Sequence, residues 1–195
     1  MYSDKPFVYT DTNLQDNDLV DELMKPSQSA KVFGHGKLGK IWLEVLQCSD
    51  LPPKKQRGLG LLLEKKKTNA FVNVVYEDCV SRTDTINDSY EPKWIPSTNR
   101  AFCLNMMYPS SPIFLGVFDN GAGPLRSHNF IGRAVVDVTK LKPDTEYILK
   151  YNLWDTAMKS KRLKKGEIMV RENACLNVRK LVLQYLSHLI NGRSV

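Results

Sequence analysis

The chain has 195 residues, of which 42% are hydrophobic and 25% charged, a composition that indicates one globular domain with tails. No stretch approaches the roughly 18 to 20 apolar residues of a membrane-spanning helix, and the first residues lack the features of a signal peptide, so we expect a cytoplasmic protein. The formal net charge of +7 is uneven: residues 1–36 hold six acidic residues and three lysines, a balance of −3, so the rest carries +10 and favours an anionic partner.

Residues 1–36 have the composition of an acidic, disordered tail. They are polar and are interrupted by prolines and glycines. A short helix over Asn13–Met24 is the alternative for the middle of this segment.

The segment 37–172 has the pattern of a β-sandwich domain. Ile41, Leu43 and Val45 alternate with more polar residues, which is the period of a strand with one buried face. Similar runs, separated by turns rich in Pro, Gly, Asn and Asp, predict eight strands in an antiparallel Greek-key sandwich. The expected strands are Lys40–Gln47, Ala70–Glu77, Ser81–Ile86, Arg100–Met106, Pro112–Asp119, Ile131–Asp137, Thr145–Leu153 and Gly166–Arg171.

The last segment, 173–195, changes to a helical period. Val178, Val182, Leu186 and Leu189 recur at helical spacing, and Gly192 is a plausible stop. We expect an amphipathic helix that packs on the sandwich or on a protein partner, with a membrane-surface helix as the alternative.

No motif of a common catalytic site is present. The sequence lacks a G-x-S-x-G elbow, a P-loop and an H-E-x-x-H pair, so we expect no enzyme. The four cysteines form no CxxC pair, and no histidine stands at zinc-finger spacing from them. We expect free thiols in a reducing compartment.

Three local patterns occur in an order that resembles the C2 domain, a calcium- and lipid-binding β-sandwich. They are Ser-Asp-Leu-Pro at 49–52 after the first strand, Pro-Lys-Trp at 92–94, and Val-Phe-Asp-Asn-Gly at 117–121 followed by Asn-Phe-Ile-Gly at 129–132. The strand order looks closer to the circularly shifted, type II variant of that family. The resemblance implies a sandwich that binds membranes through the loops at one end.

The resemblance also implies that the calcium site is degenerate. Calcium needs six to eight oxygen ligands, and in this family about five aspartates supply most of them. The first of these has no counterpart here, and the other positions hold Asn69, Asp119, Gly121 and Asn129. We therefore expect no calcium and no other cofactor or metal, with Asp119 acting as a hydrogen-bonding residue at the loop end; weak calcium-dependent lipid binding is an alternative.

The first loop combines basic and apolar residues, which suits an anionic phospholipid surface. Each basic residue near such a surface contributes about 1 kcal/mol, and a fully buried leucine roughly 1.5 to 3 kcal/mol. We predict a peripheral membrane-targeting function without calcium. The predicted lipid-binding residues are Lys54, Lys55, Arg57, Leu59, Leu61, Leu62, Leu63, Lys65, Lys66 and Lys67. In the alternative reading, the leucines fold back on the sandwich and the lysines are only solvated.

Other functions compete with lipid binding. A calcium-independent protein-interaction C2 domain, as a scaffold or as a fragment of a larger multi-C2 protein, is the main alternative that the resemblance implies. Nucleic acid is not expected, because the basic loop is aliphatic where base stacking favours aromatic residues. A second basic cluster is interpreted as a solvated turn; its members are Lys159, Lys161, Arg162, Lys164 and Lys165.

Overall fold

The computed structural model describes residues 7–8, 17–54, 66–121, 128–155 and 163–176. Within them lie eleven strands, one α-helix and one short 3-10 helix. Their bounds are β1 Phe7–Val8, α1 Asn17–Met24, β2 Lys31–Phe33, β3 Gly39–Ser49, β4 Thr68–Tyr76, β5 Cys79–Arg82, β6 Ile86–Ser89, β7 Ala101–Met106, β8 Ile113–Asp119, β9 Asn129–Val136, η1 Val138–Lys140, β10 Glu146–Trp154 and β11 Lys164–Leu176.

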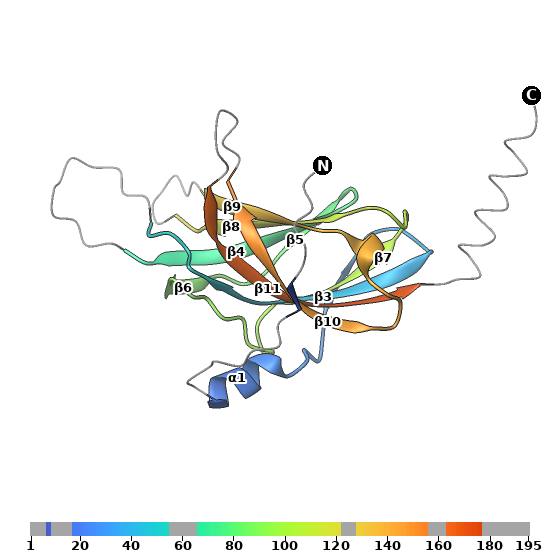
Figure 1. The fold of residues 1–195 in the computed structure, drawn as a ribbon, viewed down its shortest axis with the longest axis horizontal. Coiled ribbons are helices and arrows are strands. Elements are labelled where there is room, and N and C mark those ends of the chain that lie inside the picture. The colour runs from blue at the N-terminus through green and yellow to red at the C-terminus, as the bar shows by residue number, and fades with distance from the viewer. Residues whose placement is uncertain (1–6, 9–16, 55–65, 122–127, 156–162, 177–195) are drawn as a thin grey trace, which may run out of the picture.

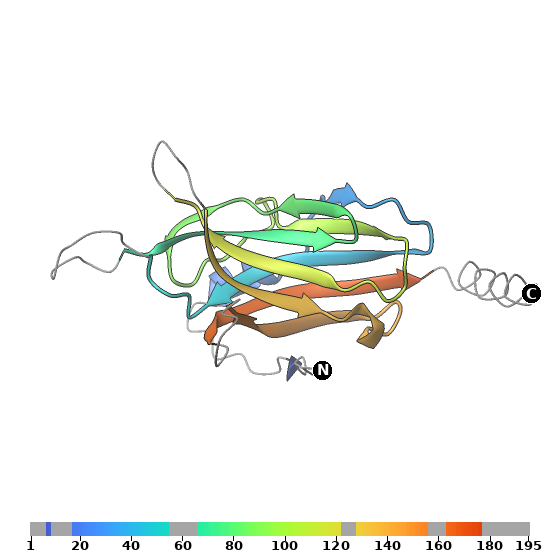
Figure 2. The ribbon, with the colours of Figure 1, turned by 90° about the horizontal axis from the view of Figure 1, so that it is seen from above.

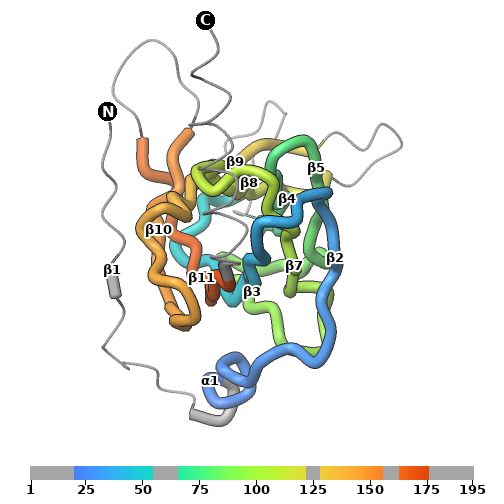
Figure 3. The backbone as a smooth tube through the Cα atoms, turned by 90° about the vertical axis from the view of Figure 1, so that its right-hand side faces the viewer, coloured from blue at the N-terminus to red at the C-terminus, as the bar shows by residue number. Residues whose placement is uncertain are grey.

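The strands form a two-layered sandwich (Figure 1). Their order is β2-β7-β3-β11-β10-β9-β8-β4-β5, with β1 beside β10 and β6 beside β4. β10 meets β9 at one residue pair, Trp154 and Arg133, and at this corner the sheet passes from one layer to the other (Figure 3). The pairings are antiparallel except that of β2 with β7, which is parallel.

The core lies between the layers and contains the side chains that the alternating patterns predicted. Ile41, Leu43 and Val45 of β3 are fully buried, and so is Trp94. The indole Nε1 of Trp94 donates to the carbonyl oxygen of Asp84 at 2.8 Å, so this large side chain is buried with its polar atom satisfied. The paired strands and the core buried between their two layers confirm the predicted all-β sandwich.

Seven of the eight expected strands are present, and the eighth is divided. The expected strand Ser81–Ile86 is split into β5 and β6. The chain turns inward between them, where Thr83 is buried and its Oγ1 accepts a hydrogen bond from the backbone N–H of Val72 at 2.9 Å. The next residue, Asp84, binds the backbone and side chain of Asn99, which prevents a continuous strand.

Residues 17–36 pack on the sandwich, contrary to the expectation of a disordered tail for this part of the chain. Helix α1 lies against the outer face of the layer that holds β3 and β11 (Figures 1 and 3). Leu23 is buried there in a small cluster with Leu46 of β3 and Met169 of β11. After α1, β2 pairs with β7 at the edge of the sheet.

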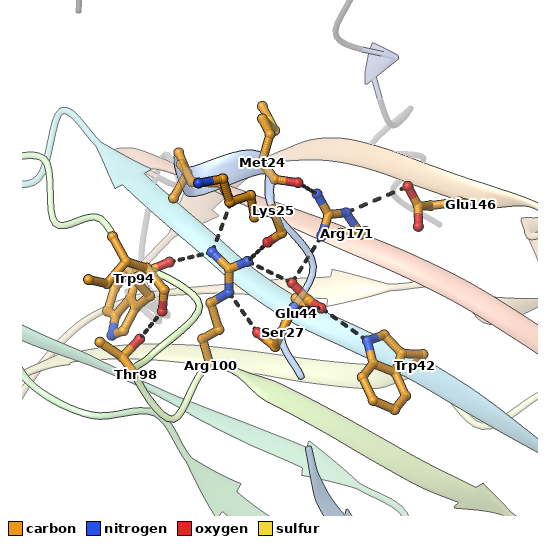
Figure 4. A network of polar contacts seen from close by, with 12 residues as sticks. Met24, Lys25, Ser27, Trp42, Glu44, Trp94, Thr98, Arg100, Glu146 and Arg171 are labelled. Atoms are coloured by element: carbon orange, nitrogen blue, oxygen red, sulfur yellow. Dashed lines mark hydrogen bonds and ion pairs between the residues drawn. The ribbon is translucent and has the colours of Figure 1, made fainter. Parts of the chain in front are cut away.

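A buried ionic network fixes the end of α1 (Figure 4). The last carbonyl groups of a helix have no partner within the helix. Arg100 donates to the carbonyl oxygen of Leu23 at 2.9 Å, and Arg171 donates to that of Met24. Both guanidinium groups also contact the Glu44 carboxylate, at 3.0 and 3.1 Å, so one buried carboxylate serves as the ionic partner of two arginines.

The C-terminal part of the sandwich extends further than expected. β11 continues to Leu176 and pairs with the whole length of β3, so residues 173–176 belong to a strand and not to the expected helix. The rest of that expected helix, including Val178, Val182, Leu186 and Leu189, lies outside the described residues. Among the residues that are described, no helix has the length and apolar character that crossing a bilayer requires.

Candidate functional site

Two loops that the sequence singles out leave the same end of the sandwich (Figure 2). β3 ends at Ser49 and β4 begins at Thr68, while β8 ends at Asp119 and β9 begins at Asn129. Because β4 pairs antiparallel with β8, and β8 with β9, the last three of these ends meet, and hydrogen bonds between residues 52–54 and 66–68 join the end of β3 to the start of β4. Residues 50–67 and 120–128 therefore connect strands at a common end.

The base of the first loop is closed by hydrogen bonds between its two limbs. The backbone N–H of Lys54 donates to the carbonyl oxygen of Lys66 at 2.9 Å, and Thr68 Oγ1 donates to that of Pro52 at 2.9 Å. Lys66 and Lys67 are exposed on this base. The other predicted lipid-binding residues lie outside the described part of the chain: Lys55, Arg57, Leu59, Leu61, Leu62, Leu63 and Lys65.

The side chain of Lys54 turns inward to the remaining aspartate. Its Nζ lies 3.2 Å from Oδ1 of Asp119, with 17% and 3% of the two side chains exposed. The same Nζ reaches the carbonyl oxygen of Asn120 at 3.4 Å. Lys54 was predicted to contact lipid, but the structure gives it an internal carboxylate as partner.

Asp119 acts within the fold as the hydrogen-bonding residue that the sequence suggested. Its Oδ1 also accepts the backbone N–H of Asn69 at 2.9 Å, which ties the start of β4 to the end of β8. Its other oxygen, Oδ2, is buried and has no hydrogen-bond partner in the described part of the chain. Oδ1 of Asp119 therefore contacts both the backbone amide of Asn69 and the ammonium group of Lys54.

The remaining degenerate calcium positions add little coordinating capacity. The side-chain oxygen of Asn69 accepts the backbone N–H of Asp88 at 2.9 Å, so that oxygen is already engaged in a turn. Asn129 stands opposite Asp119 across β8 and β9, and Gly121 has no side chain to contribute. A calcium ion prefers six to eight oxygens and several negative charges, which this set does not supply.

A cavity of about 420 Å³ opens beside the Lys54–Asp119 pair. Asn129, Phe130 and Ile131 of β9 form part of its wall, and Lys165 and Asp155 form another part. Lys165 Nζ lies 3.6 Å from Asp155 Oδ2, so the four charged side chains that line the cavity within the described residues form two ion pairs of zero net charge. Local sequence patterns give no sign that Asp155 lies at this end, because only the pairing of β9 with β10 at Trp154 brings it there.

The second basic cluster is partly described, and there its charges are paired. Lys164 Nζ contacts the Glu167 carboxylate at 2.6 Å, and Lys165 contacts Asp155. The other members, Lys159, Lys161 and Arg162, lie outside the described residues. The part that can be seen is therefore closer to a neutral turn than to a basic patch.

Comparison with known proteins identifies the class. The sequence profile of the C2 domain family matches residues 39–153. The chain therefore belongs to the C2 domain family, whose members are lipid- and membrane-binding modules that typically bind phospholipid membranes.

Several plant proteins are similar in sequence. Multiple C2 domain and transmembrane region protein 11 of Arabidopsis thaliana is 31% identical over 150 residues, which cover 73% of this chain and 18% of that protein. Protein QUIRKY of the same plant is 29% identical over 147 residues, covering 73% and 13%. FT-interacting protein 1, also from Arabidopsis thaliana, is 27% identical over 172 residues, covering 83% and 20%. The chain thus spans a fifth or less of these relatives.

Solved structures show the same fold. A C2 domain of plant Extended Synaptotagmin 1 superposes with a TM-score of 0.57 at 16% identity, covering 73% of this chain and 98% of that domain. The calcium-bound pair of C2 domains of Extended-Synaptotagmin 2 gives a TM-score of 0.55 at 20% identity, covering 73% and 47%. At these identities the likeness establishes the architecture.

Proposed function

We propose that this C2 domain binds anionic phospholipid surfaces without calcium. The observation that carries the proposal is the Lys54–Asp119 ion pair, in which an ammonium group of the chain lies on the one carboxylate left at the calcium-ligand positions. An internal cation removes the negative charge that would otherwise attract calcium and repel an anionic membrane. With the Asp119 charge neutralised by Lys54, this end of the sandwich does not need a bound calcium ion to approach an anionic lipid surface.

The attraction to the membrane is assigned to the rest of the first loop. Because Lys54 is held by Asp119, five basic residues of the loop remain, and Glu64 reduces their net charge to four. At about 1 kcal/mol for each charge near an anionic leaflet, the electrostatic contribution is about 4 kcal/mol. Leu61, Leu62 and Leu63 add an apolar contribution if they enter the interface, and two such signals together hold a peripheral protein.

Vesicle sedimentation of the full chain tests the proposal. We expect binding to vesicles of phosphatidylcholine and phosphatidylserine, at equal levels with calcium and with a calcium chelator, and little binding to phosphatidylcholine alone. Binding that requires calcium would contradict the role given to Lys54. Absence of binding to both kinds of vesicle would contradict the lipid function itself.

A second candidate is protein binding, which an apolar row on the outer face of the β5-β4-β8-β9 layer favours. Val80, Phe114 and Val135 are exposed large apolar side chains. They lie in one line across the strands, because Val75 pairs with both Val80 and Phe114, and Phe114 pairs with Val135. Such a row suits an apolar patch of another protein more than a charged headgroup.

A further inference from the structure

Three side chains with metal-binding atoms meet at the end of the sandwich opposite the basic loop. β3 runs toward that loop and β4 runs away from it, so the segment before β3 and the turn after β4 lie together at the far end (Figure 2). His35 lies in the first of these, and Asp78 and Cys79 in the second. A ring nitrogen, a carboxylate oxygen and the thiol sulfur all lie within 4.8 Å of one another.

The backbone around His35 is fixed by close contact with the end of β7. Gly36 N–H donates to the carbonyl oxygen of Asn105, and the Asn105 side-chain amide donates to the carbonyl oxygen of Gly34 at 3.2 Å. A Cβ at Gly36 would lie 1.7 Å from the Met106 carbonyl carbon, so only glycine permits this approach. Gly34 has a φ of +89°, which also favours glycine. His35 therefore projects from a segment pressed onto β7.

The turn that carries Asp78 and Cys79 is tied to the same strand end. Tyr76 pairs with Cys79 across β4 and β5, so Glu77 and Asp78 form a two-residue turn. The Glu77 carboxylate accepts the backbone N–H groups of Met107 and Tyr108, at 3.1 and 2.9 Å. The histidine and the turn are thus held by consecutive residues of one segment, 105–108, although they are far apart in sequence.

From this arrangement we propose a binding site for a divalent metal ion of the zinc class, held by His35, Asp78 and Cys79. Zinc takes imidazole nitrogen, thiolate sulfur and carboxylate oxygen at about 2.0 to 2.3 Å in tetrahedral geometry, and three protein ligands leave one position for water. Ligand atoms in such a site are about 3.3 to 3.7 Å apart. His35 and Asp78 are exposed side chains, so rotation about their side-chain bonds can close the remaining distance.

The ligand set selects this class of ion over calcium or magnesium. Those ions take oxygen ligands almost exclusively, whereas a thiolate and an imidazole suit zinc and neighbouring transition metals. The Cys79 sulfur lies 3.3 Å from Asp78 Oδ1 as a thiol donor. Metal binding would replace that proton, and the bound ion would join the β2–β3 segment to the β4–β5 turn. This site is separate from the lipid-binding end and does not depend on it.

Cobalt titration of the full chain, in a phosphine reductant that does not bind metal, tests the site. Co²⁺ is a spectroscopic probe for zinc sites, and a thiolate ligand gives an intense charge-transfer absorption in the near ultraviolet. We expect this absorption in the unmodified chain and its disappearance when Zn²⁺ is added. His35→Ala and Asp78→Asn should each weaken metal binding at least about 10-fold, since even indirect partners of metal ligands have effects of that size. Cys79→Ser should abolish the absorption.

Cys175→Ser is the matched control. Cys175 is an exposed thiol that, like the half-buried Cys79, lies beside a carboxylate, that of Asp144, and its replacement should leave the cobalt spectrum unchanged. Circular dichroism will show whether each variant is folded. The proposal is overturned if the unmodified chain gives no thiolate absorption, if Cys79→Ser keeps it, or if Cys175→Ser removes it.

Discussion

The Lys54 ammonium and the Asp119 carboxylate form an ion pair at 3.2 Å in which the aspartate is almost completely shielded from solvent. Removal of one partner from such a pair leaves the other charge buried without compensation. Asp119 is also the one carboxylate at the positions that the C2 resemblance assigns to calcium ligands, so replacement of its partner tests stability and calcium dependence together.

We expect Lys54→Met to lower the free energy of unfolding by about 1 to 3 kcal/mol, the cost of leaving a buried hydrogen-bonding group without its partner. Millimolar calcium should not restore the loss, because a single carboxylate binds calcium poorly. Urea unfolding with and without calcium measures both effects. Lys66→Met, which removes the same charge from an exposed position on the same loop base, should change stability by less than about 0.5 kcal/mol. Recovery of Lys54→Met by calcium would show that Asp119 does bind the ion.

The leucines of the first loop should contribute to membrane affinity independently of charge. Replacing Leu61, Leu62 and Leu63 together by serine keeps every charge and removes about 3 kcal/mol of apolar transfer, so binding to phosphatidylserine vesicles should weaken roughly 100-fold. The control is the triple replacement of Val80, Phe114 and Val135 by serine, which removes three apolar side chains from the outer face of the sheet. The control should bind vesicles normally. If it loses vesicle binding while the leucine variant keeps it, the assignment of the membrane contact to the loop is wrong.

Glu44 should be among the most sensitive positions of the fold. It is fully buried between Arg100 and Arg171, and Glu44→Gln removes the buried carboxylate that contacts both guanidinium groups. We expect a loss of about 3 to 5 kcal/mol in the free energy of unfolding. Glu146→Gln is the comparison, because Glu146 also approaches Arg171, at 3.6 Å, but its side chain is 60% exposed and its contribution should be less than about 1 kcal/mol. Equal losses in the two variants would contradict this account.

Glu172 should make stability fall as pH rises. This residue of β11 is buried inside the sandwich, and burial raises the pKa of its carboxyl from 4.5 to about 8, while the nearby Tyr151 hydroxyl opposes the shift. Between these two values the folded chain holds a proton that the unfolded chain has lost. Unfolding then releases a proton, so stability decreases from pH 4.5 toward pH 8, by up to roughly 5 kcal/mol.

Glu172→Gln removes the titrating group while keeping nearly the same shape. The variant should lack the decrease that Glu172 causes between about pH 5 and pH 8, and it should be more stable than the unmodified chain near pH 8. Urea midpoints at both pH values measure the difference. A parallel decrease in both proteins would assign the pH dependence to other groups.

Local patterns were sufficient to predict most of the sandwich. Ile41, Leu43 and Val45 show the strand period within a few residues, and all three are fully buried in the structure. The division of Ser81–Ile86 into two strands could not be predicted, because it depends on the contact of Asp84 with Asn99 across a loop. The lack of a carboxylate at Asn69 and Gly121 could be read from the sequence, but the turn of Lys54 toward Asp119 could not.

The order of residues 17–36 depends on contacts that are very distant in sequence. The polar composition of this segment predicted disorder, yet Arg100 holds the end of α1 from 77 positions away and Arg171 from 147. The proposed metal site has the same character, since His35 and Cys79 show no recognisable spacing and are brought together only by the end of β7. Local periodicity carries no information about such pairs.

Because Arg171 contacts Glu44 and the end of α1, the folded domain is longer than the segment that matches the family profile. The family match ends at residue 153, before β11 begins, and it starts at residue 39, after α1 and β2. A fragment cut at those limits would lose the strand that lies between β3 and β10, and it would leave Glu44 without Arg171. Transfer of this domain into another protein, by recombination or by design, would therefore require both flanks to travel with it.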